Sequence, residues 1–226
     1  MCGRATITSS YKEVEEFLGF SFESDLIREY NNRVPNFNVA PTHELPIYTA
    51  EDDRPLSFMR WGLIPFWAKD HKIGSRLINA RAETVPVKAS FRAAFKKRRC
   101  LVILDGYYEW RKSEEGKIPY RITYKSGKPF AVAGLWENWK SPDGQNIQSF
   151  TMITRAANVP MSAIHHRMPY AVKKEYHRLW LEGQFPGTGW EHFMEESSLP
   201  FQDYYRVSTD VNKVVNNQPE LVEAVE

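Results

Sequence analysis

Apolar and polar residues alternate between positions 118 and 124, and few folds accommodate such a segment outside a sheet. Its apolar members are Ile118, Tyr120, Ile122 and Tyr124. Successive side chains of a β-strand point to opposite faces, so the pattern predicts a half-buried strand. A Lys-Ser-Gly-Lys turn sequence at 125–128 precedes an apolar run at 130–136. We therefore expect these two segments to form a β-hairpin.

Other segments add strands and helices around this hairpin. Strand patterns occur at 100–108 and 150–154. Ser10 and Glu13 have the spacing of a capping box, which predicts a helix from Tyr11 that ends at Gly19. Weaker helical patterns cover 90–97 and 173–181. Together they predict an α+β fold built on a curved, mostly antiparallel sheet or open barrel with peripheral helices.

Length and charge limit the domain organisation and the class of partner. The 226 residues suit one domain, 1–226, although two lobes stay open as an alternative. The net charge is only +2, from 30 basic and 28 acidic residues, so a nucleic-acid binder would need a local basic face. Residues 96–99, Lys-Lys-Arg-Arg, are one candidate, and a solvated helix end is the alternative interpretation.

Cysteine usage and hydropathy indicate the compartment. Cys2 and Cys100 are the two cysteines, which form no disulfide framework and suit a reducing compartment. The first thirty residues include Glu13, Glu15 and Glu16, and neither a signal peptide nor a membrane-spanning run is recognisable. We expect a cytoplasmic protein with no membrane contact.

The opening residues Met1-Cys2-Gly3-Arg4 contain an unusual pair of nucleophiles. If Met1 is removed, Cys2 carries a free α-amine and a thiol on adjacent carbons. No internal cysteine can offer this pair.

Four polar islands combine an acid, base or amide with arginines or aromatic residues: 61–67, 79–84, 105–110 and 165–169. That composition suits a site that holds a flat, anionic ligand. Taken singly, each residue has a commoner structural explanation. Glu109 at a strand end is usually a surface carboxylate, Asn79 a turn residue, and Trp61 and Trp67 packing residues.

Together these motifs resemble the SRAP (SOS response-associated peptidase) family, whose members process abasic sites in single-stranded DNA. The resemblance spans nearly the whole chain and is carried by seven motifs in order: residues 1–4, 38–41, 61–65, 79–84, 99–110, 165–169 and 207–212. It implies one SRAP-like domain, a role in the DNA damage and SOS responses, and single-stranded DNA with abasic sites as the partner.

The resemblance also implies a covalent chemistry for Cys2. Its α-amine would attack the ring-opened aldehyde of an abasic sugar. An α-amine has a pKa near 8, against about 10.4 for lysine, so much more of it is neutral and nucleophilic at physiological pH. The neighbouring thiol would then close a five-membered thiazolidine ring. The stable DNA-protein crosslink would protect the lesion, with β-elimination of the strand as a lyase side reaction. No cofactor or metal is expected.

Three further catalytic roles are implied by the same resemblance. Glu109 would shuttle protons, with a pKa raised by partial burial. His165 would be the second acid/base group, and Asn79 would orient the sugar or the cysteine.

The DNA-binding residues that the resemblance implies lie around these groups. Arg4, Arg81 and Arg167 would hold the phosphates that flank the lesion. Pro41 and Trp67 would support or wedge the neighbouring bases. We expect a monomer, while contacts with the replication machinery are not readable from the sequence.

Position 166 departs from the family pattern, in which we expect a carboxylate after the first histidine. A second histidine, His166, stands there, and it would share proton transfer with His165 or change its pKa. The histidine pair has no further Cys, His or carboxylate spacing that would support a metal site.

Three other functions stay open. Class II glutamine amidotransferases also begin with Met-Cys-Gly and use a terminal cysteine thiolate, but 226 residues leave little room for their synthase domain. An autoprocessing peptidase that removes its own Met1 is the second. The third is a non-catalytic DNA-binding module in which Cys2 is merely buried.

Overall fold

A closed β-barrel forms the centre of the molecule in a computed structural model that describes residues 2–50, 55–114, 116–124, 127–185, 187, 189–199 and 203–226. The barrel strands are β3 (Glu44–Tyr48), β4 (Leu56–Trp61), β6 (Arg99–Leu104), β9 (Phe130–Lys140) and β10 (Asn146–Ala156). They close in the order β4-β3-β6-β9-β10, and β10 pairs with β4 to complete the ring. All these pairings are antiparallel except the parallel β4–β10 pair.

Short strands extend the barrel along β9 and β10: β5 (Asn79–Arg81), β11 (Arg167–Pro169) and β12 (Ala171–Val172). β5 runs parallel to β10, opposite residues 152–154. β11 runs antiparallel to β10, opposite residues 154–156. Thr154 is paired with Arg81 on one side and with Pro169 on the other, so the 79–81 and 167–169 motifs flank the same stretch of β10.

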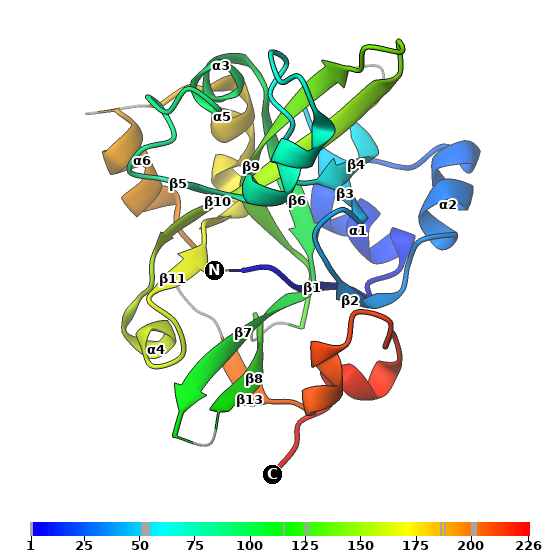
Figure 1. Cartoon of the computed structure of the whole chain (residues 1–226), viewed down its shortest axis with the longest axis vertical. Coiled ribbons are helices and arrows are strands. Elements are labelled where there is room, and N and C mark those ends of the chain that lie inside the picture. Colours follow the sequence, from blue (N-terminus) through cyan, green and yellow to red (C-terminus); the bar gives the residue numbers. More distant parts are fainter. Residues whose placement is uncertain are drawn as a thin grey trace.

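A second, antiparallel sheet lies beside the barrel, and the start of the chain runs between the two (Figure 1). Its strands, in spatial order, are β13 (Asp203–Arg206), β8 (Gly116–Thr123), β7 (Gly106–Ser113), β1 (Ala5–Ile7) and β2 (Asn36–Val39). The predicted α+β fold with a mostly antiparallel sheet or barrel is confirmed. Whether 1–226 is a single domain stays a prediction.

The predicted hairpin between 118–124 and 130–136 is wrong, and residues 125 and 126 of its expected turn lie outside the described residues. β8 pairs with β7 and β13, whereas β9 pairs with β6, β10 and β12. The two hydrophobic patterns explain the separation. β9 is buried continuously from Phe130 to Glu137, as suits a barrel strand covered on both faces, whereas β8 is only partly covered.

The strand predicted for 100–108 is divided at Asp105, where the chain passes from β6 to β7. The Asp105 carboxylate accepts the backbone N–H of Thr8 at 2.6 Å and that of Ser9 at 3.0 Å. It also accepts a hydrogen bond from the Ser9 hydroxyl. Asp105 therefore fixes the chain after β1 to the junction between the two sheets.

Helices and short 3₁₀ turns surround the sheets (Figure 1). The α-helices are α1 (Tyr11–Leu18), α2 (Ser24–Asn31), α3 (Arg92–Lys97), α4 (Val159–Ser162), α5 (His177–Glu182) and α6 (Trp190–Ser197). The 3₁₀ turns are η1 (His71–Arg76), η2 (Lys174–Tyr176), η3 (Thr209–Asn212) and η4 (Pro219–Val222). None of the helices in the described residues is long and apolar enough to cross a membrane.

The helix predicted from the capping box is confirmed as α1. The Ser10 backbone N–H donates to Glu13 Oε2 at 2.7 Å, and the Glu13 N–H donates to Ser10 Oγ at 3.4 Å. Gly19 ends the helix in the left-handed region, with φ of 81°.

Two large clusters of buried side chains lie on either side of the barrel wall. One joins the helices to the barrel and includes Val14, Tyr30, Phe95 and Trp180. The other joins the barrel to the second sheet. Cys2 belongs to the second cluster, so the fold draws the start of the chain into its apolar interior.

Candidate active site

Cys2 lies at the junction of the two sheets, directly before β1. The Tyr108 backbone N–H donates to the Arg4 carbonyl at 3.0 Å, which aligns the opening residues with β7. The Cys2 side chain is 1% exposed, and its Sγ lies 3.7 Å from the Arg4 carbonyl oxygen. Burial raises the pKa of the Cys2 thiol far above its ordinary value, and the charge of Glu109 raises it further. The thiol is therefore protonated at neutral pH.

Glu109 on β7 is the buried carboxylate of this region. The residue is only 3% exposed, and burial raises the pKa of its carboxyl group. Its Oε1 lies 3.9 Å from Nδ1 of His165. A buried carboxyl group with a raised pKa next to an imidazole is suited to donate and accept protons during a reaction.

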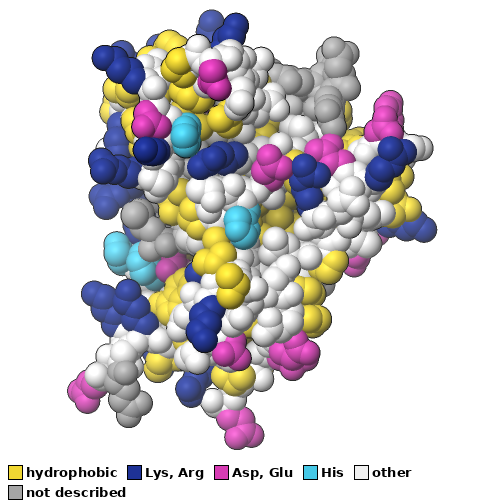
Figure 2. Space-filling model, turned by 45° about the vertical axis from the view of Figure 1, so that its right-hand side comes forward, with side chains coloured by type: hydrophobic (Ala, Val, Ile, Leu, Met, Phe, Trp, Pro, Cys, Tyr) yellow, Lys and Arg dark blue, Asp and Glu magenta, His cyan; other side chains and the backbone are white. Residues whose placement is uncertain are grey.

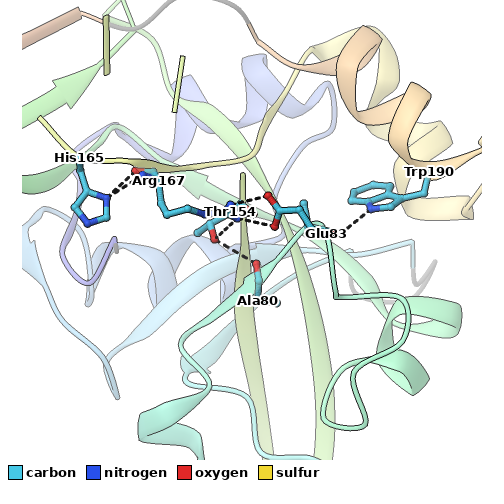
Figure 3. A network of polar contacts seen from close by, with 7 residues as sticks. Ala80, Glu83, Thr154, His165, Arg167 and Trp190 are labelled. Carbon is cyan, nitrogen blue, oxygen red and sulfur yellow. Dashed lines mark hydrogen bonds and ion pairs between the residues drawn. The ribbon is translucent and has the colours of Figure 1, made fainter. Parts of the chain in front are cut away.

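His165 lies between α4 and β11. Its Nδ1 accepts the Arg167 backbone N–H at 3.0 Å and lies 3.1 Å from the Arg167 carbonyl oxygen (Figure 3). Burial lowers the pKa of His165, so the ring is mainly neutral at pH 7.

His166 is exposed, and its ring lies 4.3 Å from that of His165, measured between centroids. The charge of His165 lowers the pKa of His166. A protonated His165 therefore disfavours protonation of His166, as expected for adjacent basic groups.

Asn79 begins β5, and its side chain reaches the opening residues. Its Nδ2 donates to the Cys2 carbonyl oxygen at 2.6 Å. Its Oδ1 is buried and has no hydrogen-bond partner among the described residues. The amide thus holds Cys2 with its donor and keeps an acceptor available.

Arg167, which is buried, pairs with the half-exposed carboxylate of Glu83. Its Nη1 and Nη2 donate to the two carboxylate oxygens of Glu83 at 2.6 and 3.0 Å, and Nη2 also donates to the Thr154 carbonyl at 2.5 Å (Figure 3). The guanidinium group is thereby fixed between β5, β10 and β11. Its predicted contact with phosphate stays a prediction.

Arg4 is likewise held by internal acceptors. Its Nη1 donates to Asn38 Oδ1 at 2.6 Å and to the Val211 carbonyl at 2.5 Å, while Nη2 donates to the Asn212 carbonyl at 3.2 Å. These contacts give the 38–41 and 207–212 motifs a structural role, since they join the start of the chain to its C-terminal segment.

The other predicted DNA-binding residues are more open. Arg81 is exposed at the end of β5, where its charge contributes to lowering the pKa of Glu83 and of His166.

Pro41 is half-buried in the turn before Thr42, which has a φ of 77°. Trp67 is 50% exposed and lines a separate hollow with Lys69, Lys72 and Arg76. The structure thus brings Cys2, Asn79, Glu109 and His165 together, while Trp67 lines a different hollow.

A hollow of about 460 Å³ opens next to Glu109 and His165. Its lining residues are Glu109, Trp110, Lys112, Lys117, His165 and Asn212, and we call it the Glu109 hollow. Trp110 Nε1 donates to Asn212 Oδ1 at 2.7 Å across its wall. Our sequence analysis did not identify Lys112, Lys117 or Asn212 as site residues. The two lysines lie between the strand patterns at 100–108 and 118–124, and no local pattern singled them out.

The described residues offer no group of three or more His, Cys, Asp and Glu side chains that would hold a metal ion. The reactive groups at hand are a buried thiol, a buried carboxyl group, a neutral imidazole and an amide. This set suits proton transfer and nucleophilic attack on a carbonyl carbon.

Comparison with known proteins gives consistent matches over this chain. The family model described as "SOS response associated peptidase (SRAP)" matches residues 1–214. "Abasic site processing protein YoqW" of Bacillus subtilis strain 168 is 39% identical over 230 residues, covering 99% of this chain and 100% of that protein. "Abasic site processing protein HMCES" of Xenopus tropicalis is 29% identical over 267 residues, covering 100% of this chain and 78% of that protein. A crystal structure of a protein from Bacteroides thetaiotaomicron is 28% identical, covers 100% of both chains and has a TM-score of 0.86.

Proposed function

The chain belongs to the SRAP family, and from that premise we propose that it processes abasic sites in DNA through Cys2. Relatives along its full length are named abasic site processing proteins, which supports this general activity. The observation that carries the proposal for Cys2 is the convergence of Cys2, Asn79, Glu109 and His165 at the junction of the two sheets. The finer claims are a single-stranded substrate, removal of Met1 and a thiazolidine crosslink.

In this proposal the α-amine of Cys2 acts first, once Met1 has been removed. Burial keeps the thiol protonated, whereas a free α-amine has a pKa of about 8 and is partly neutral at pH 7. The amine nitrogen adds to the aldehyde carbon of the opened sugar. Loss of one water molecule then gives an imine.

The thiol closes the ring in the second step. The sulfur adds to the imine carbon, its proton passes to a base, and the imine nitrogen takes up a proton. Glu109 is suited to move these protons, because its charge acts on the Cys2 thiol and its pKa is raised by burial. The balance is aldehyde plus cysteine to thiazolidine plus water.

His165 and Asn79 assist this chemistry. A neutral His165 can accept the proton of the sugar hydroxyl as the ring opens. Asn79 positions Cys2 through its carbonyl group. β-Elimination of the 3′ phosphate competes only while the imine persists, so rapid ring closure keeps strand cleavage a side reaction.

A thiolate-dependent amidohydrolase fits these groups less well. Such an enzyme needs the ionised sulfur as its nucleophile, and both burial and the nearby Glu109 carboxylate disfavour ionisation of Cys2. The proposal therefore predicts no release of ammonia from glutamine.

Intact mass spectrometry tests the proposal. Protein lacking Met1 is incubated with a single-stranded oligonucleotide that carries one abasic site. Matched strands carry either no lesion or a tetrahydrofuran lesion, which has no aldehyde. We expect one adduct, equal to protein plus oligonucleotide minus one water, only with the true abasic site.

Two variants separate the chemical steps. Cys2→Ser keeps the amine but lacks the thiol, so it should give an adduct only when borohydride reduces the imine. Cys100→Ala, which changes the other buried cysteine, should react like the wild type. The absence of any adduct from fully processed wild-type protein would refute the mechanism.

A further inference from the structure

Two lysines face each other across the β7–β8 hairpin beside the candidate active site. Lys112 and Lys117 are directly opposite in the antiparallel register, and both are exposed. Both also line the Glu109 hollow, together with His165. The charge of Lys112 contributes to lowering the pKa of His165, which indicates that the lysine lies near the imidazole.

This arrangement costs stability without a compensating partner in the described part of the chain. Like charges directly opposite on neighbouring strands repel each other. Neither lysine makes an ion pair or side-chain hydrogen bond with the residues that the structure describes. An anion placed between the two ammonium groups would relieve the repulsion.

The arginines that our sequence analysis assigned to phosphates are mostly engaged elsewhere. Arg167 is bound by Glu83, and Arg4 by Asn38 and two C-terminal carbonyls. A strand that enters the Glu109 hollow therefore needs other cations for its phosphates. Figure 2 shows Lys and Arg side chains above and below a group of His side chains along the left edge of the molecule, as a track for a polyanion would require.

We propose that Lys112 and Lys117 form a phosphate-binding pair that holds the DNA strand next to the abasic site. This inference rests on the proposed function for the identity of the lesion. The pair acts on strand affinity and position, whereas Cys2 and Glu109 carry the covalent chemistry. Lysine suits this task because its ammonium group contacts phosphate as a point charge, without demanding one base sequence.

Salt-dependent binding to the tetrahydrofuran strand tests the pair without covalent reaction. For single strands, each phosphate contact adds about 0.7 to the slope of log affinity against log salt concentration. The double variant Lys112→Gln/Lys117→Gln should therefore reduce that slope by about 1.4 and weaken binding roughly tenfold or more at 0.1 M salt. Lys112→Arg/Lys117→Arg should restore most of the binding.

A matched double variant controls for net charge. Lys12→Gln/Lys140→Gln removes two exposed lysines, one on α1 and one in the β9–β10 hairpin. It should leave the slope within about 0.5 of the wild-type value, whereas loss of one phosphate contact at each lysine would change it by about 1.4. Methylphosphonate substitution then locates the contact. Neutralising one phosphate near the lesion should weaken wild-type binding and leave the Lys112→Gln/Lys117→Gln variant unchanged.

Failure of this inference is distinguishable from failure of the proposed function. A wild-type slope in the Lys112→Gln/Lys117→Gln variant overturns the phosphate pair, whether or not the wild type forms an adduct. Equal losses in wild type and variant at every methylphosphonate position also overturn it. Normal lysine-dependent binding without any adduct would instead refute the chemistry at Cys2 and leave the pair standing.

Discussion

Asn79 and Cys2 are joined by a hydrogen bond of 2.6 Å from the side-chain amide to the backbone carbonyl. The bond links β5, on the edge of the barrel, to the residues that precede β1 in the second sheet. A neutral amide keeps this role at every pH, because it does not titrate. The position of Cys2 is therefore set from the barrel side by Asn79 and from the sheet side by its alignment with β7.

Replacing Asn79 with alanine should slow the reaction at Cys2. The substitution removes the donor that fixes the Cys2 carbonyl, and a displacement of about 1 Å in a reacting group can cost roughly 100-fold in rate. We expect adduct formation with the abasic strand to slow by about 10- to 100-fold in single-turnover experiments. Affinity for the tetrahydrofuran strand should change little.

Asn146→Ala is the matched control for this prediction. Asn146 is an exposed amide at the start of β10, opposite Lys140 and in the β9–β10 hairpin. Its loss should leave the rate unchanged. Equal rates for Asn79→Ala and the wild type would contradict the positioning role.

Glu109→Gln should stabilise the protein at neutral pH while it slows the reaction. Burial raises the pKa of Glu109 in the folded state, so the folded protein binds this proton more tightly than the unfolded chain. Wild-type stability should therefore fall as pH rises from the ordinary glutamate pKa of about 4.3 through the raised value. Glutamine does not titrate and avoids this loss.

Urea unfolding of both proteins between pH 4 and pH 8 measures the difference. The Glu109→Gln variant should gain stability over the wild type as pH rises, and its adduct formation should be slower by about 100-fold or more. A constant difference in stability across this range would show that the Glu109 pKa is not raised. An unchanged rate would remove Glu109 from the proton transfers.

Local sequence patterns predicted those elements whose signals lie within a few residues of each other. The Ser10 and Glu13 spacing gave the correct start of α1, and Gly19 its end. The alternation at 118–124 correctly indicated a strand. The hairpin failed because a turn sequence cannot show which sheet the next strand joins, and β8 and β9 belong to different sheets.

Long-range contacts limit how much of the candidate site can be predicted from the sequence. The motifs pointed to Arg167, but its partner Glu83 stands 84 positions earlier in the chain, and no local pattern pairs them. Asn79 and Cys2 are separated by 77 positions in the same way. The sequence therefore singled out candidate groups, while their internal partners required the fold.

Glu83→Gln should destabilise the protein with a pH dependence opposite to that of Glu109→Gln. A hydrogen bond from Arg167 lowers the pKa of Glu83, so the stability it contributes is present above the ordinary glutamate pKa and disappears as pH falls through the lowered value. Because the Glu83 side chain is 49% exposed, we expect a modest loss of about 1–2 kcal/mol at pH 7.

Urea titrations at pH 7 and at pH 3 check the direction of this pH dependence. The difference between wild type and Glu83→Gln should shrink at the lower pH, where the wild-type carboxylate becomes protonated. Glu195→Gln changes an exposed glutamate of α6 and should have no such effect. An equal loss of unfolding free energy at both pH values would show that the charge of Glu83 does not stabilise the fold through Arg167.

The loop that carries Trp67 is closed at its base by Gly62 and Gly74. Gly62 has a φ of 119°, and a Cβ atom there would lie 2.7 Å from the Gly74 carbonyl oxygen. Gly62→Ala would therefore add a backbone clash to the strain of a positive φ. Gly144, in the β9–β10 hairpin, has a φ of 90° with nothing within 4 Å of its Cβ position, so Gly144→Ala reports the conformational strain alone.

We expect Gly144→Ala to cost about 1 kcal/mol and Gly62→Ala to cost about 2 kcal/mol or more, because only the latter must separate two backbone segments. Urea unfolding measures both losses. Tryptophan fluorescence quenching by acrylamide should change only in Gly62→Ala, since its clash displaces the loop that bears the half-exposed Trp67. Equal losses in the two variants would show that the contact between Gly62 and Gly74 does not constrain this loop.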